Sequence, residues 1–257
     1  MKKEEDSTLL ERTILLHIAY DGTNYHGWQI QPNGITIEEV LNRAVSDLCQ
    51  EEIQVIGASR TDSGVHAIDN IAVFSTNFKM DATKICYALN QRLPDDIRIM
   101  KSYETTRGFH PRRCRSKKEY KYQIYCDRIE DPLVSRYMCF EYCPVDVERM
   151  KEAAKYLVGE HDFKSFCAVR TQARTTVREI YKLDITKEGN IITIIIEGNG
   201  FLFNMVRIIV GTLLKVGRGA YEPPHVQTIL EAGNRSLAGP TACAKGLTLN
   251  KYTFLEE

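Results

Sequence analysis

The chain carries at residues 36–48 the segment Thr36-Ile-Glu-Glu-Val-Leu-Asn-Arg-Ala-Val-Ser-Asp-Leu48. Thr36 followed by Glu39 is a capping-box pattern, in which each side chain can satisfy a free backbone amide at the start of a helix. Apolar side chains then recur at helical spacing as far as Leu48. The segment therefore predicts an amphipathic helix.

Segments with the pattern of strands lie on both sides of this helix. In chain order, we expect a strand at Glu11–Tyr20, the helix, strands at Ile53–Ala58 and Ile68–Thr76, a helix at Asp81–Gln91 and a strand at Ile97–Tyr103. This is the β-α-β-β-α-β order of ferredoxin-like and RNA-recognition (RRM-like) folds.

The rest of the chain repeats that order with different residues. We expect a strand at Glu119–Cys126, a helix at Val147–Val158, strands at Thr176–Thr186 and Ile191–Glu197, a helix at Asn204–Val216 and a strand at Gly246–Phe254, with a short inserted helix near Pro224–Ala232. The prediction is an α+β fold of two RRM-like (ferredoxin-like) halves, residues 1–105 and 106–257. Their sheets either join or face each other across a groove.

The composition is that of an ordinary globular protein, with 257 residues, 43% hydrophobic and 26% charged. The 34 basic and 34 acidic residues cancel, so only a local patch could favour nucleic acid. The charged start Met1–Asp6 does not resemble a secretion signal, and no apolar run reaches the roughly 18 residues of a membrane span. We expect a cytoplasmic protein with reduced cysteines. We expect no metal site either, since Cys139 and Cys143 lack histidines at zinc-site spacing.

Basic residues are concentrated in two segments. Residues 107–121 hold seven of them against the single acid Glu119, and a second group follows at Lys164, Arg170, Arg174, Arg178 and Lys182. Such strips bind phosphate backbones, and the interleaved Phe109, His110, Tyr120 and Tyr122 could stack on bases. A solvated basic face explains the charges about as well.

Two further segments are candidates for chemistry. Residues 57–66, Gly-Ala-Ser-Arg-Thr-Asp-Ser-Gly-Val-His, follow a predicted strand and could present Asp62 at the edge of a sheet, although a polar turn is the simpler interpretation. The predicted helix Asn204–Val216 contains, among apolar side chains near its start, the isolated cation Arg207. A buried guanidinium needs a carboxylate partner or several other acceptors, and Asp62 is a plausible partner. A structural tie and a catalytic pair both predict this contact, but only the catalytic pair predicts an open pocket beside it.

At this point the chain resembles the tRNA pseudouridine synthase A family. The matching segments are Tyr20-Asp-Gly-Thr-Asn-Tyr-His-Gly-Trp-Gln29, Arg60-Thr-Asp-Ser-Gly-Val-His66, Phe109-His110, Glu119-Tyr-Lys-Tyr122, Gly159-Glu-His-Asp-Phe163, Phe203-Asn-Met-Val-Arg207, Gly211-Thr-Leu-Leu214 and Gly217-Arg-Gly219, in the family's order. The resemblance implies an enzyme that isomerises uridine to pseudouridine in the anticodon stem-loop of tRNA, at positions 38, 39 and 40. It also implies a homodimer without cofactor or metal, and two halves that meet at a central catalytic cleft.

The resemblance also implies the roles of individual residues. Asp62 matches the catalytic aspartate, Arg60 the arginine near the target nucleotide, Tyr120 the active-site tyrosine, Arg207 the arginine paired with the aspartate and Leu247 an apolar wall of the pocket. The chain departs from the family pattern at Arg113 and Arg115, where smaller or aromatic residues are usual, and at Lys245, where some members carry histidine.

Two other classes of function are weighed beside this one. An RNA-binding module without chemistry would share the basic strips and the order of elements, but it needs no Asp–Arg pair. A nucleotide-dependent enzyme has little support, because the chain has no P-loop and no G-x-G-x-x-G motif. We expect Trp28 in the core, His66 and His161 as hydrogen-bonded loop residues, Tyr122 in sheet packing and the cysteines as buried small hydrophobes.

Overall fold

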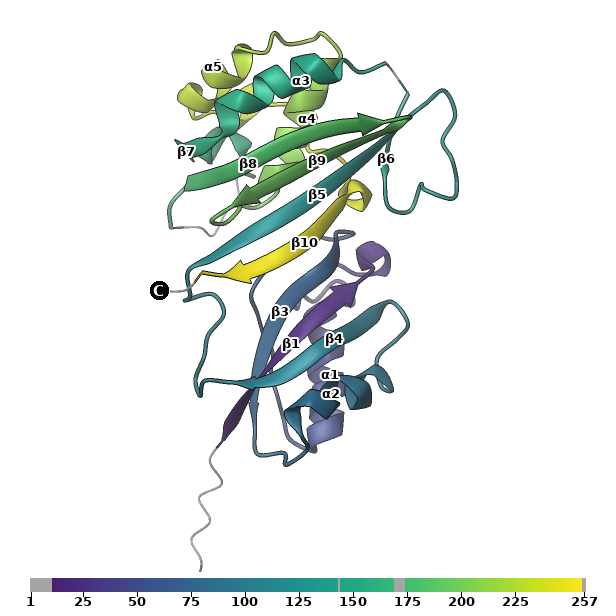
Figure 1. Ribbon diagram of the computed structural model, residues 1–257, viewed down its shortest axis with the longest axis vertical. Coiled ribbons are helices and arrows are strands. Elements are labelled where there is room, and N and C mark those ends of the chain that lie inside the picture. Colours follow the sequence, from purple (N-terminus) through teal and green to yellow (C-terminus); the bar gives the residue numbers. More distant parts are fainter. Residues whose placement is uncertain (1–10, 143, 169–173, 256–257) are drawn as a thin grey trace, which may run out of the picture.

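The computed structural model describes residues 11–142, 144–168 and 174–255, so Met1–Asp6, Cys143 and Arg170 lie outside the described residues. Within these ranges ten strands form one mostly antiparallel sheet (Figure 1). The strands are β1 Arg12–Tyr20, β2 Ile56–Gly57, β3 His66–Thr76, β4 Ile97–Thr105, β5 Ser116–Cys126, β6 Cys139–Glu141, β7 Gly159–Asp162, β8 Val177–Glu188, β9 Ile191–Gly198 and β10 Leu247–Phe254. The helices are α1 Ile37–Cys49, α2 Ala82–Asn90, α3 Val147–Ala154, α4 Met205–Gly217 and α5 His225–Ala232. The predicted mixed fold of helices and strands is confirmed.

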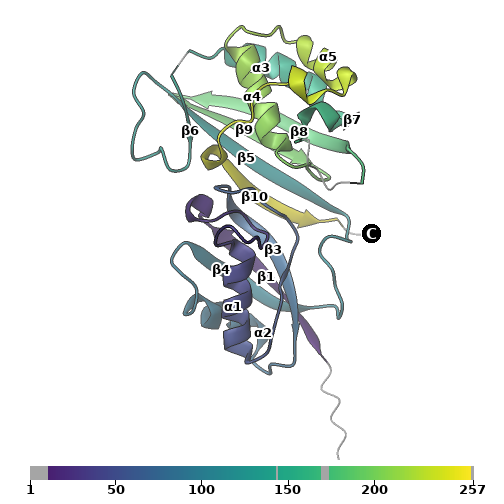
Figure 2. The ribbon, with the colours of Figure 1, turned by 180° about the vertical axis from the view of Figure 1, so that it is seen from behind.

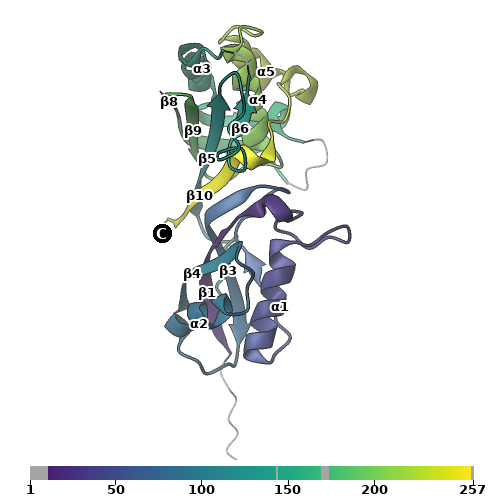
Figure 3. The same ribbon diagram turned by 90° about the vertical axis from the view of Figure 1, so that its right-hand side faces the viewer.

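The strands follow one another across the sheet in the order β4-β1-β3-β10-β5-β9-β8-β7, with β2 on β3 and β6 on β5. The two parts of the chain meet where β3 and β10 pair in parallel, His66 opposite Thr248 and Ala67 opposite Leu249. The sheets therefore join. Figures 2 and 3 show α1 and α4 on the same face of this continuous sheet. The division at residue 105 stays a prediction.

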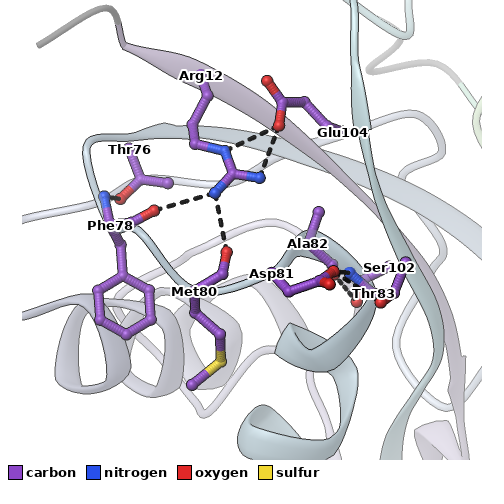
Figure 4. A network of polar contacts seen from close by, with 9 residues as sticks. All are labelled: Arg12, Thr76, Phe78, Met80, Asp81, Ala82, Thr83, Ser102 and Glu104. Carbon is purple, nitrogen blue, oxygen red and sulfur yellow. Dashed lines mark hydrogen bonds and ion pairs between the residues drawn. The ribbon is translucent and has the colours of Figure 1, made fainter.

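The start of α1 has the Thr36 cap that the sequence predicts, and α2 has a cap that was not predicted. Thr36 Oγ1 accepts a hydrogen bond from the Glu39 amide at 3.3 Å at the start of α1. At α2 the carboxylate of Asp81 accepts from the Thr83 amide at 2.8 Å (Figure 4). Each cap satisfies an amide that has no partner within its helix.

Arg12 anchors β1 to its neighbours, as Figure 4 shows. Its Nε and Nη2 atoms donate to the Glu104 carboxylate on β4 at 3.0 and 2.6 Å. Its Nη1 atom donates to the backbone carbonyls of Phe78 and Met80, at 3.3 and 2.8 Å, in the connection to α2. One guanidinium thus ties the strand, its neighbour β4 and the approach to α2 together.

The strand predicted at Ile53–Ala58 is mostly wrong, because only Ile56–Gly57 pairs with β3. Side chains of α1 take the backbone amides that a ladder would use. Ser46 Oγ accepts from the Ile53 amide at 2.9 Å, and Asn42 Oδ1 accepts from the Val55 amide at 2.8 Å. The short strands β6 and β7 are additions that the sequence pattern does not predict.

The core lies between the sheet and the helices. Nearly every residue of α4 is buried, and Trp28 has only 1% of its surface exposed, as expected for a core residue. The expectation for the cysteines holds for Cys49, Cys86 and Cys167. It is wrong for four that lie near the surface and are partly exposed, namely Cys114, Cys126, Cys139 and Cys243. Within the described ranges, no helix is both long and apolar enough to span a bilayer.

Candidate active site

A cleft of about 750 Å³ lies where the two parts of the sheet meet. It is lined by the segment 58–62, by the start of α4 and by the side of β5. All five residues predicted for the site line it, namely Arg60, Asp62, Tyr120, Arg207 and Leu247. The structure thus brings the predicted set together around one space.

The segment that carries Asp62 is held from below by buried polar groups. The Tyr20 hydroxyl shares a hydrogen bond of 2.7 Å with Thr61 Oγ1. Asn70 Nδ2 donates to the Ser59 carbonyl at 3.1 Å and to the Tyr20 hydroxyl at 3.3 Å. Because these groups have no access to water, breaking one bond leaves an unsatisfied polar atom, and this keeps the loop in one conformation.

Trp28 also holds this loop. Its amide donates to the Thr61 carbonyl at 3.0 Å. Its indole ring lies so close to Gly57 that a Cβ atom there would meet Cε2 at 2.3 Å. Gly27, at φ +85°, lets the chain pass close to the Thr61 carbonyl, whose oxygen would lie 2.7 Å from a Cβ atom there. Glycine at both positions allows the tryptophan to pack directly under the loop.

Asp62 and Arg207 form the expected ion pair, with Nη1 of the arginine 3.2 Å from Oδ2 of the aspartate. The guanidinium is held on two other sides: Nε donates to the Ala242 carbonyl at 2.8 Å, and Nη1 donates to Asn204 Oδ1 at 2.9 Å. Each side chain of the pair keeps 17% of its surface exposed, so the pair sits at the floor of the cleft and is not sealed in the core.

The pKa of the Asp62 carboxyl is set by burial and by Arg207, which act in opposite directions. Burial raises the pKa of Asp62 above its ordinary value, and the charge and hydrogen bond of Arg207 offset only part of that effect. The carboxylate is therefore more basic than a surface aspartate.

Tyr120 and Leu247 form an apolar wall of the cleft. Only 8% of Tyr120 is exposed, and its ring meets Phe201 edge to face at 5.2 Å between centroids. Burial, together with the nearby Tyr20 and Asp62, raises the pKa of the Tyr120 hydroxyl, so the phenol stays protonated. Among the described residues that hydroxyl has no hydrogen-bond partner. A flat ring and an apolar wall suit a planar base.

Besides Arg207, four cations line the cleft around this wall: Arg60, Arg112, Lys118 and Arg178. Within the described part of the chain, none of the four has a carboxylate within 4.0 Å. Arg112, Lys118 and Arg178 come from the two predicted basic strips, which thus contribute to one site. Cations without a carboxylate partner, beside the apolar wall of Tyr120 and Leu247, favour a polyanionic ligand with unstacked bases.

The other residues singled out in the sequence have structural contacts. Tyr122 is buried and donates to the Cys243 carbonyl at 2.8 Å, as expected for sheet packing. His66 begins β3 and accepts from the Gly22 amide at 3.1 Å, so the expected loop position is wrong although the hydrogen bond is present. His161 lies in β7, with Nε2 3.0 Å from the Val158 carbonyl oxygen. Lys245 pairs with Glu130 at 2.8 Å.

Asn204, Phe201 and Lys118 line the site but were not proposed for it from the sequence. Asn204 has a left-handed backbone (φ 61°) and directs its side chain to Arg207 instead of capping α4. The available signal was an Asn three residues before the isolated arginine. For Lys118, the signal was its place two residues before Tyr120, which puts both side chains on one face of a strand.

The chain is similar to known proteins along nearly its whole length. The profile of a family described as tRNA pseudouridine synthase matches residues 17–112 and 153–254. The tRNA pseudouridine synthase A of Thermoanaerobacter sp. (strain X514) is 45% identical over 243 residues, which is 95% of this chain and 100% of that protein. The tRNA pseudouridine synthase A of Ruminiclostridium cellulolyticum is 46% identical over 239 residues, or 93% and 98% of the two chains. Among solved structures, one chain of an H/ACA RNP bound to a substrate RNA containing 2′-deoxyuridine is 13% identical, with a TM-score of 0.37. The match covers 79% of this chain and 44% of that chain. The assignment to a family therefore rests on the similarity in sequence.

Proposed function

The chain belongs to the tRNA pseudouridine synthase family, whose members are isomerases that act on tRNA, and from this premise we propose that Asp62 is its nucleophile. The observation that carries the proposal is the carboxylate of Asp62, held by Arg207 at the floor of a cleft lined with unpaired cations. Oriented, partly exposed and more basic than usual, this carboxylate has the properties that nucleophilic catalysis requires.

The reaction needs the target uridine out of its stack, because neither its glycosidic bond nor its C5 edge is accessible within a stem. The N1–C1′ bond then breaks, the uracil turns in place and a C5–C1′ bond forms. C5 loses a proton and N1 gains one, so the product is an isomer and no oxidant or reductant is consumed. Asp62 attacks either the ribose C1′, where it displaces N1 and is itself displaced when C5 bonds to C1′, or the uracil C6, from which it is eliminated once the C5–C1′ bond has formed. Both atoms belong to a nucleoside seated against Tyr120.

The neighbours of Asp62 have separate roles in this proposal. Arg207 fixes the direction of the carboxylate. Tyr120 and Leu247 enclose the uracil, which favours rotation and recapture over escape. Because its pKa is raised, the Tyr120 hydroxyl stays protonated and is not available as a base, so its role is to pack against the uracil and to donate a hydrogen bond. Arg60, exposed at the rim, occupies the space vacated by the flipped nucleotide or contacts its phosphate.

The finer assignments rest on the resemblance described above. The target uridines are those at positions 38, 39 and 40 of the anticodon stem-loop, and the protein acts as a cytoplasmic homodimer of two-part subunits divided near residue 105. Arg113 and Arg115 are both exposed, so their departure from the family pattern bears on RNA contacts and not on the floor of the cleft. Mapping pseudouridine in tRNA from cells with and without the protein tests the positions, and light scattering of the purified protein tests the dimer.

Tritium release tests the central claim. Transfer RNA that carries tritium at C5 of uridine loses the tritium to water whenever the bond from C5 to hydrogen is replaced by a C5–C1′ bond. We expect release with the unaltered protein. Asp62→Asn should reduce release to background while tRNA binding stays within a few-fold. Release by the Asn variant at the normal rate would remove Asp62 from the chemistry, and no release by the unaltered protein would contradict the synthase proposal.

A further inference from the structure

Lys118 occupies a position in the cleft that the proposed chemistry does not use. It lies on β5 two residues before Tyr120, and successive side chains of one face are spaced by about 7 Å along a strand. Its Nζ atom donates to the Ala58 carbonyl at 3.3 Å and lies over the Tyr252 ring, 5.4 Å from the centroid. The ammonium group is thus fixed beside the loop that carries Asp62.

The surroundings of Lys118 are unfavourable for a cation. Burial and the charges of Arg112 and Arg178 lower the pKa of Lys118 to about 8. Burial and the charge of Arg60 also lower the pKa of Arg112, and Glu38 offsets only part of this. The adjacent Lys117, by contrast, is paired with Glu197 at 3.1 Å. Cations that repel one another around open space are stabilised when an anion binds between them.

Building on the proposed function, we propose that Lys118, Arg112 and Arg178 form a phosphodiester site that holds a backbone phosphate next to the flipped uridine. Asp62 and Tyr120 face the ribose and the uracil, and a phosphate is separated from its own base by one ribose. Lys118 is the next residue on the same face of β5 as Tyr120. When the uracil contacts Tyr120, the phosphate of that nucleotide therefore reaches Lys118. The site positions the nucleotide before any bond breaks and takes no part in the chemistry.

A substrate with one uncharged linkage tests this site. Anticodon stem-loop RNAs are prepared with a single methylphosphonate either at the phosphate 5′ to the target uridine or at the phosphate 3′ to it. Each is assayed with the unaltered protein and with Lys118→Met, and pseudouridine formation is followed to obtain kcat and KM. Lys121→Met is the matched control, since Lys121 lies on the same strand three residues away and projects from the opposite face.

We expect Lys118→Met to raise KM about 10- to 100-fold with kcat changed less than threefold, as for a lost charge-assisted hydrogen bond. In Lys118→Met the slope of log KM against the logarithm of the salt concentration should fall by the amount expected for the loss of about one phosphate contact. One of the two methylphosphonates should impair the unaltered protein similarly and add little to Lys118→Met, because both changes remove the same contact. Lys121→Met should behave like the unaltered protein on every substrate.

Three results would overturn the assignment. They are equal effects of Lys118→Met and Lys121→Met, fully additive effects of Lys118→Met with both methylphosphonates, and a loss confined to kcat. The last result would give Lys118 a chemical role. The unaltered protein on unmodified RNA separates this question from the proposed function: if it forms no pseudouridine, the synthase proposal fails, whereas if it forms pseudouridine without the predicted coupling, only the phosphate site fails.

Discussion

Nη1 of Arg207 lies 3.2 Å from Oδ2 of Asp62, although 145 positions of sequence separate the two residues. The contact joins the loop before β3 to the first turn of α4, and it does so at the floor of the cleft. A purely structural tie would have no need of that open space. The orientation and ionisation of the Asp62 carboxylate therefore depend on how the two parts of the sheet are joined.

Replacing Arg207 should alter how activity depends on pH. Burial raises the pKa of Asp62, and Arg207 opposes that rise. With Arg207→Met the opposition is lost, so the acid limb of kcat/KM should move up by roughly 1–3 pH units. The sign follows because the nucleophile must be ionised, and a higher pKa means that activity is lost earlier as the pH falls. Tritium release between pH 4.5 and 9 measures the shift.

Arg207→Lys is the control for this experiment, because it keeps the positive charge and loses the paired geometry. Its acid limb should move less than that of Arg207→Met, while its plateau should still fall. Profiles of equal midpoint in all three proteins would mean that Asp62 is not the group that controls the acid limb.

The buried hydrogen bond between Tyr20 and Thr61 should stabilise both the fold and the active loop. Tyr20→Phe leaves the Thr61 hydroxyl without this partner, so the free energy of unfolding should fall by about 1–2 kcal/mol and turnover should fall with it. Thr61→Val added to Tyr20→Phe should cost less than the sum of the single changes. Urea unfolding and tritium release measure the two effects.

Tyr125→Phe is the matched control, since that hydroxyl contacts the Asp127 carboxylate near the surface, at 3.1 Å. It should change neither quantity appreciably. Strict additivity of Tyr20→Phe and Thr61→Val would contradict the idea that this one hydrogen bond holds the loop.

Gly57→Ala should destabilise the protein through Trp28. The new methyl group would lie 2.3 Å from the indole ring, which is buried. Overpacking of this kind costs about 1–3 kcal/mol, and here the displaced tryptophan also pulls on the Thr61 carbonyl. Thermal melting and activity should both decline.

Gly200→Ala serves as the comparison for Gly57→Ala. A methyl group at Gly200 would meet only the Arg178 side chain, at ordinary contact distances from 3.7 Å. Its melting temperature should stay near that of the unaltered protein. A similar small effect from Gly57→Ala would show that Trp28 has room to move.

The fold and the site could be predicted from the sequence where the physical cause is local, or where a buried charge has few possible partners. The cap of α1 is a local pattern, and the isolated Arg207 in an apolar helix required a carboxylate or several other acceptors. The strand at Ile53–Ala58 failed because Asn42 and Ser46 bind its amides across a turn, a contact that no periodicity encodes. Lys118 was hidden among seven basic residues, and the local sign that it faces the cleft was its place two residues before Tyr120 on the same strand.

The lowered pKa of Lys118 predicts a stability effect that is independent of RNA. Its pKa in the folded protein, about 8, lies below the ordinary 10.5, so between these values the unfolded chain retains a proton that the folded chain has lost. Stability contributed at this site therefore rises from pH 8 to pH 10.5, and below pH 8 the buried charge is fully destabilising.

Lys118→Met should accordingly raise the free energy of unfolding at pH 7, by an amount on the order of 1–3 kcal/mol. The advantage of the Met variant over the unaltered protein should shrink steadily as the pH rises to 10.5. Urea unfolding at pH 7, 8.5 and 10 measures it, with Lys121→Met, on the opposite face of the same strand, as the control variant. A Met variant less stable than the unaltered protein at pH 7 would mean that the contacts of Lys118 with Ala58 and Tyr252 outweigh the repulsion, and that the three cations are not held in an unfavourable arrangement while the cleft is empty.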